Sequence, residues 1–175
     1  MGIIGNESLT LNAEQLIDII RCNWTKEIKD PLILFDGEDV ETVMLAGHVT
    51  AMATAIKESD HLSLHINNTD GSVQSCTFDS EDEIVFENYS KIVVDWENVG
   101  GTGDYHSRIA KCGYVGSGST PFFSGAPTMH GPFARQTTTI DISGDTSTGY
   151  HLRVHATCNE VAESILKVYS IELEV

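Results

Sequence analysis

Residues 91–96 read Lys-Ile-Val-Val-Asp-Trp, and this stretch decides the fold because its side chains alternate. The second, fourth and sixth residues are apolar, whereas the first and fifth are charged. Successive side chains of an extended chain point to opposite faces, so this pattern predicts a strand with one buried and one solvated face. Strands of that kind are typical of antiparallel sheets.

The alternation recurs along the chain. In the final stretch, residues Ile165, Tyr169, Ile171, Leu173 and Val175 are predicted to share one face. Further strands are predicted at 32–35, 47–55, 62–66, 73–78, 83–86, 107–115, 135–141 and 151–156. Gly-, Asn- and Asp-rich turns separate them. Short strands at this spacing predict an all-β antiparallel sandwich, a jelly roll, over residues 32–175.

The N-terminal segment, residues 1–31, has a different pattern. Its apolar residues recur at helical spacing, with Asn12 as a candidate cap and Pro31 as the end. So short a helix is marginal alone, so we expect it to pack on a larger assembly. The candidate docking residues are Leu16, Ile17, Ile20 and Trp24.

The charge balance limits the partners. The chain carries 26 Asp and Glu against 10 Lys and Arg, a net charge of −16. Binding to nucleic acid or to an anionic membrane needs the opposite sign, so neither partner is expected. There is no signal-peptide pattern at the N-terminus and no apolar run of about 18 residues, the length a membrane span needs.

Cysteines and histidines give no metal-site motif. The cysteines stand far apart without a CxxC pair, which predicts reduced and mostly buried thiols. The pairs His61/His65 and His151/His155 are spaced four apart, which on a strand separates the side chains by about 13 Å. The acidic run 79–83 is interpreted as a solvated loop, and a structural calcium ion bound by its carboxylates stays an open alternative. We therefore expect no cofactor and no transition metal.

Neither GxSxG nor HExxH occurs, so no enzymatic activity and no catalytic residue is predicted.

The long loop from Gly116 to Phe133 is the best candidate for a binding site. A loop of this length is uncommon and is usually either functional or disordered. Its aromatic residues, with those nearby, suit stacking against sugar rings, but packing on the domain or on a neighbouring subunit is the favoured interpretation. The candidate glycan-binding residues are Tyr114, Phe122, Phe123 and His130.

Several phrases resemble a β-sandwich module of phage and prophage tail-associated proteins from Gram-positive hosts. Residues 32–47 (LILFDGEDVETVMLAG) resemble its opening strand and turn, and 86–96 (FENYSKIVVDW) a later strand. Residues 137–156, with TIDIS and GYHLRVHA, resemble a strand pair, and 168–174 the closing strand. The resemblance implies a jelly roll similar to carbohydrate-binding modules, used on virions and often trimeric, with no catalytic residues.

The function implied is that of a non-enzymatic virion structural protein, a tail, baseplate or head-decoration subunit. Residues 1–31 would dock it among other virion proteins, and the sandwich would be displayed, contacting host surface glycan. It would be made in the host cytoplasm and assemble as a homo-oligomer, with a trimer favoured. Two alternatives stay open: a free carbohydrate-binding module, and a jelly-roll glycan hydrolase, which needs two carboxylates converging in a cleft.

Overall fold

The structure is a computed structural model. It describes residues 30–100, 107–118, 121, 123, 124, 126, 128, 129 and 132–175. The predicted N-terminal helix and its four docking residues lie outside this part of the chain, so they stay predictions. The only helix in the described part is a single 3-10 turn, η1 (Phe86–Asn88), and none there is long and apolar enough to cross a membrane.

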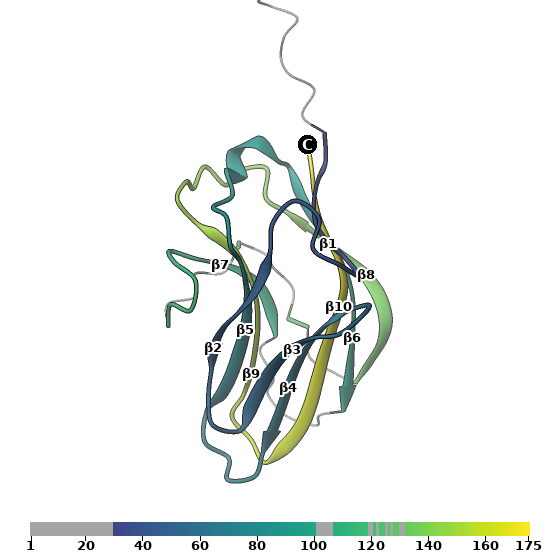
Figure 1. The fold of residues 1–175 in the computed structure, drawn as a ribbon, viewed down its shortest axis with the longest axis vertical. Coiled ribbons are helices and arrows are strands. Elements are labelled where there is room, and N and C mark those ends of the chain that lie inside the picture. Colours follow the sequence, from purple (N-terminus) through teal and green to yellow (C-terminus); the bar gives the residue numbers. More distant parts are fainter. Residues whose placement is uncertain are drawn as a thin grey trace, which may run out of the picture.

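The described chain is an antiparallel β-sandwich of two sheets, as the alternating pattern predicts (Figure 1). The six-stranded sheet has the order β3-β4-β10-β6-β8, with β1 paired to β10. The four-stranded sheet has the order β2-β5-β9-β7. The strands are β1 (Leu32–Asp36), β2 (Met44–Val49), β3 (Ala53–Lys57), β4 (Leu62–Asn68), β5 (Gln74–Ser80), β6 (Lys91–Gly100), β7 (Arg108–Cys112), β8 (Phe133–Asp141), β9 (His151–Cys158) and β10 (Ala162–Glu174).

The core lies between the two sheets and is built from the alternate apolar positions of their strands. Ile92, Val94 and Trp96 of β6 are all buried, which confirms the face predicted from the opening stretch. Three thiols belong to the buried set: Cys76, Cys112 and Cys158 are free and buried, as expected. Burial raises the pKa of Cys76 to about 12, so this thiol stays protonated.

The predicted face of the last strand is wrong in its first half. Ile171 and Leu173 are fully buried, but Ile165 and Tyr169 lie on the outer face, and Val175 follows the end of β10 and is exposed. A β-bulge between Val168 and Ser170 inserts one residue into β10 opposite β6, and this changes the parity of the strand. A period-two pattern cannot reveal such an insertion, because residues on both faces of β10 are partly apolar.

Two other strand predictions are also wrong. The segment 47–55 forms two strands, β2 and β3, which belong to different sheets and are separated by a turn at 50–52. The segment 83–86 makes only an isolated bridge, Ile84 to Tyr150, before the chain enters η1. In both places the chain passes from one sheet to the other, so the strand ends although residues with high β propensity continue.

Part of the long loop closes one side of the sandwich. Lys111 of the edge strand β7 donates its backbone N–H to the carbonyl of Pro121 at 3.0 Å, and Met129 donates to Ser107 at 2.7 Å. The side chains of Phe123 and Met129 enter the core, with exposed fractions of 3% and 1%. This part of the loop therefore packs on its own domain.

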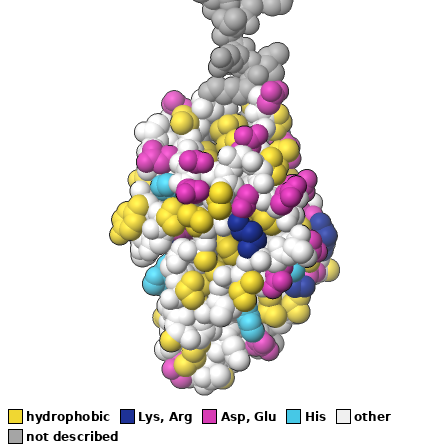
Figure 2. All heavy atoms as spheres, in the orientation of Figure 1, with side chains coloured by type: hydrophobic (Ala, Val, Ile, Leu, Met, Phe, Trp, Pro, Cys, Tyr) yellow, Lys and Arg dark blue, Asp and Glu magenta, His cyan; other side chains and the backbone are white. Residues whose placement is uncertain are grey.

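The surface agrees with the charge count. In Figure 2, Asp and Glu side chains gather over the upper part of the visible face, and Lys and Arg are sparse there. Such a surface repels polyanions, in line with the partners excluded by composition.

Candidate functional site

The outer face of the four-stranded sheet carries a buried ion pair. Asp79 of β5 and Arg153 of β9 lie directly opposite each other, and their side chains are both fully buried. The guanidinium binds the carboxylate with two hydrogen bonds, Nε to Oδ1 and Nη2 to Oδ2, each 2.7 Å long. Charges at outward-facing sheet positions normally stay in water, because desolvating a charged pair is costly. Something must therefore cover this pair.

The cover is the loop of residues 113–118, which follows β7. Gly116 donates its backbone N–H to Oδ2 of Asp79 at 2.8 Å, and Arg153 donates from Nη1 to the carbonyl of Ser117 at 2.7 Å. Gly116 has a φ of +77°, a conformation that a side chain would disfavour. The buried pair thus binds the loop at two consecutive residues and fixes it over the sheet.

Gly47 of β2 provides the space for this arrangement. A Cβ atom at this position would lie 2.3 Å from Oδ2 of Asp79 and 2.4 Å from Oγ1 of Thr77. Because Arg153 and Gly116 hold the Asp79 carboxylate, that carboxylate cannot move aside freely. The absence of a side chain at Gly47 is therefore required for the close packing under the loop.

The fixed loop displays an aromatic ring. Tyr114 is 67% exposed, although its loop is attached to the sheet two and three residues later. Ser117 closes the turn by donating its backbone N–H to the carbonyl of Tyr114 at 3.0 Å. An exposed ring on a backbone held in this way is a preorganised contact surface.

A polar row crosses the same outer face next to the covered pair. Arg108, His155 and Thr77 are cross-strand neighbours on β7, β9 and β5. On β2, the backbone N–H of His48 donates to the hydroxyl of Thr77 at 2.9 Å. Burial, and then the charges of Arg153 and His48, lower the pKa of His155 to about 4. At neutral pH this row therefore combines a guanidinium with a neutral imidazole.

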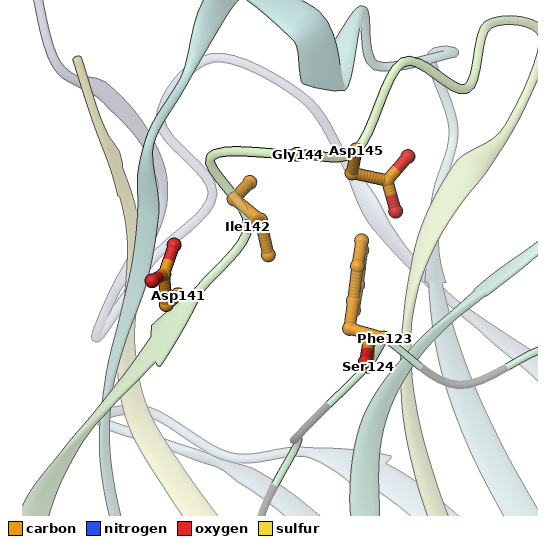
Figure 3. Close-up of a pocket in the computed structure, with 6 residues that line it drawn as sticks. All are labelled: Phe123, Ser124, Asp141, Ile142, Gly144 and Asp145. Atoms are coloured by element: carbon orange, nitrogen blue, oxygen red, sulfur yellow. The ribbon is translucent and has the colours of Figure 1, made fainter.

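Phe123 takes part in a different feature, a pocket of ≈ 200 Å³ at one end of the sandwich (Figure 3). Its ring and the Ile142 side chain face the pocket from two sides, and Asp145 lies near the end of the ring. The ring packs edge-on against Phe86, with centroids 5.0 Å apart. The Lys111 ammonium lies 5.1 Å from the Phe123 centroid. Phe123 is thus a core residue whose edge reaches a pocket.

Two carboxylates line this pocket, which is the arrangement that a hydrolase needs, but neither has the properties of a general acid. The Ser143 side chain and backbone donate to Asp141 and lower its pKa. Burial alone would raise the pKa of Asp145, but hydrogen bonds from Lys111 and Ser147 outweigh it, so its pKa is lowered as well. A glycosidase requires one carboxyl group with a raised pKa. This pair does not meet that requirement.

The structure separates the four predicted glycan-binding residues. Tyr114 is exposed on the loop that covers the outer face of the four-stranded sheet, whereas Phe123 lies in the core near the end pocket. Phe122 and His130 lie outside the described residues. Their contact with a ligand stays a prediction.

Asp79 and Arg153 are the residues that sequence reasoning missed. The prediction that Asp79 lies in a solvated acidic loop is wrong, because β5 extends to Ser80 and places Asp79 in the sheet. The alternation of β9 assigned Arg153 to the solvated face, and its true environment depends on a loop that folds back from β7. An Arg in the alternating stretch 151–156 and the first Asp of the acidic run 79–83 were the only signal. Among the described residues, no three His, Cys, Asp or Glu side chains come together as a metal site needs.

Comparison with known proteins adds little. No family model and no curated protein matches the chain. A solved structure, a family 11 carbohydrate-binding module from Clostridium thermocellum in complex with a β-1,3-1,4-mixed-linked tetrasaccharide, is similar with a TM-score of 0.47 and 16% identity. The likeness covers 82% of this chain and 95% of that one. At this level it carries no functional argument, and the tail-associated origin stays a prediction.

Proposed function

We propose that this chain is a non-catalytic glycan-binding module whose ligand stacks on Tyr114. The observation that carries the proposal is the exposed ring on a loop that a fully buried ion pair fixes to the sheet. Breaking a buried pair costs several kcal/mol, so a chain that places one beneath a surface loop holds that loop in one geometry. A preorganised loop loses little conformational entropy when a ligand binds.

The chemistry of the surface suits a sugar. A sugar ring has an apolar C–H face, which stacks on an aromatic ring, and hydroxyl groups at its edge, which need donors and acceptors. Tyr114 provides the ring, and Arg108 and His155, cross-strand neighbours on the sheet that the loop covers, are the candidate polar groups. The few placed polar groups beside an apolar surface are the usual composition of a small-ligand site.

A glycan array followed by isothermal titration calorimetry tests the proposal. Replacing Tyr114 by Ala should weaken binding of any array hit by about tenfold or more, the effect of losing about 1.5 kcal/mol of aromatic contact. Tyr114→Phe keeps the ring and should bind nearly as well as the unmodified chain.

Phe133 gives a matched control, because it is another exposed aromatic residue, 48% exposed, on a strand of the other sheet. Phe133→Ala should leave the affinity unchanged. An array without hits, or an affinity that Tyr114→Ala leaves intact, contradicts the proposal.

A further inference from the structure

Strand β8 forms an open edge of the six-stranded sheet. It is paired with β6 on one side, and no described residue pairs with its other side; it borders the sheet on the right in Figure 1. It is nine residues long, and residues 133–137 are all exposed. A long, exposed strand edge is a template for pairing with another chain.

The remaining edges are less suited to pairing. Backbone groups of Pro121 and Met129 already bond along β7. Strand β2 has six residues and a register shift between Ala46 and Val49. Strand β3 has five residues and ends on a lysine. Short length, bulges and edge lysines all discourage pairing between chains. β8 has nine residues and no lysine, and its register shift against β6 lies at its first residues, before the regular stretch 136–141.

The backbone pattern identifies which groups of β8 face outward. Ile142 donates its N–H to the carbonyl of Ser90 at 2.8 Å, which continues the register of the β6–β8 ladder. In an antiparallel ladder the hydrogen-bonded pairs alternate with non-bonded ones. Over the regular stretch 136–141 the even-numbered residues therefore bond to β6, and the N–H and carbonyl groups of residues 137, 139 and 141 face the open side.

The charge of β8 favours a second copy of the same chain. The chain as a whole carries −16, so two copies repel each other over most surfaces. β8 contains one Arg and one Asp, Arg135 and Asp141, and is therefore neutral. Both side chains lie on the outer face of the sheet, where Arg135 binds Asp95 at 2.6 Å.

We propose that two copies of this chain pair antiparallel through β8, with Thr138 on the two-fold axis. In this register Arg135 of one copy lies opposite Asp141 of the other, and Thr137 lies opposite Thr139. The backbone groups of Thr137 and Thr139 face the open side, so each Thr137–Thr139 pair exchanges two backbone hydrogen bonds. Arg135 precedes the regular stretch, so its contact with Asp141 is a contact between side chains. Shifting the axis to Thr137 places Arg135 opposite Thr139 instead and loses both charge pairs. Opposite charges that lie directly across from each other on paired strands stabilise the pairing.

A pocket on the outer face supports this register. It has a volume of ≈ 360 Å³ and is lined by Ser90, Lys91, Thr139, Asp141 and Ser143. In the proposed dimer, Arg135 of the second copy arrives beside Asp141, at the border of this pocket. Arg carries five donors, so it can bind Asp141 of the other copy while it keeps its own contact with Asp95.

Sedimentation velocity of the full chain over a range of concentrations tests the pairing. We expect a monomer–dimer equilibrium. Thr137→Pro removes an N–H that the β6 ladder does not use, so it should leave the circular dichroism spectrum unchanged and weaken association by about tenfold or more. Thr137→Ala keeps the N–H and should keep the dimer.

A charge swap and a cross-link test the register. Arg135→Glu and Asp141→Arg should each weaken association, and the double variant should restore it, since opposite charges face each other again. In a Cys22→Ser background, Thr138→Cys should form an intermolecular disulfide on oxidation, whereas Thr137→Cys should form much less. The four native cysteine positions include three that are buried, so they do not compete.

The outcomes that overturn the proposal are specific. A chain that stays monomeric at every concentration has no such interface. A dimer that Thr137→Pro leaves intact uses another surface. A trimer also contradicts the proposal, because antiparallel pairing of identical edges closes after two copies. Association of β8 only with a strand of a different protein would appear as a monomer in this experiment.

Discussion

Replacing Arg153 by Met removes the cation from the buried pair and leaves Asp79 in an environment without water. Both side chains are fully buried, and the variant loses two hydrogen bonds to Asp79 and one to the carbonyl of Ser117. Removing one partner of a buried pair costs about 3–5 kcal/mol, because the remaining charge has no compensation. That loss is a large fraction of the about 5–15 kcal/mol by which domains are stable.

Urea unfolding measures this loss. With a slope of about 2 kcal/mol per molar, a loss of about 4 kcal/mol lowers the midpoint by about 2 M. The double variant Arg153→Met/Asp79→Leu removes both charges and should recover at least about half of the lost stability. A single variant that loses less than about 1 kcal/mol, or a double variant no more stable than the single one, refutes the reasoning that the pair is dry and tightly coupled.

Four further predictions follow from particular contacts. Gly47→Ala forces a Cβ against the Asp79 carboxylate and should cost about 1–3 kcal/mol in urea unfolding, whereas Gly113→Ala, which meets nothing within 4 Å, should cost less than about 0.5 kcal/mol. The pKa of His155 falls from 6.5 to about 4 on folding, so the unfolded chain binds the proton first as the pH is lowered. The free energy of unfolding should therefore drop by about 3 kcal/mol as the pH falls from about 6.5 to about 4. His155→Gln should remove this part of the pH dependence, and a variant whose pH profile is unchanged contradicts the burial of a neutral imidazole. Phe123→Ala should lower the free energy of unfolding by about 3–5 kcal/mol because the ring is in the core, whereas Tyr114→Ala should change it by less than about 0.5 kcal/mol; equal effects would contradict the two placements. Deleting residues 1–30 should leave a folded sandwich, since the core of the described residues runs from Leu34 to Leu173, and should abolish assembly if the segment docks the chain on a virion; an unfolded product would contradict a separable anchor.

The sequence predicts the architecture because each strand has one buried and one solvent-exposed face, which gives an alternation of apolar and polar residues. Ile92, Val94 and Trp96 show the alternation directly, and their burial follows from it. The failures have a common physical cause. The bulge beside Tyr169 and the turn between β2 and β3 depend on which strands become neighbours, and a local pattern carries no information about that.

The candidate site is harder to predict for the same reason. Tyr114 was found from its residue type and its place at the start of a long loop. Asp79 and Arg153 are 74 residues apart, and each has the usual composition of a solvated position. Only the fold-back of the loop through Gly116 and Ser117 buries them. Phe123, in contrast, enters the core because its part of the loop closes the edge beside β7.

The affinity of the chain for a glycan, compared with that of Tyr114→Ala by calorimetry, tests the proposed function most directly. A saturable signal that falls by about tenfold or more in the variant, while both proteins unfold at the same urea concentration, is the predicted result. Equal affinities, or no heat of binding with any glycan of the array, would show that the fixed loop serves another purpose.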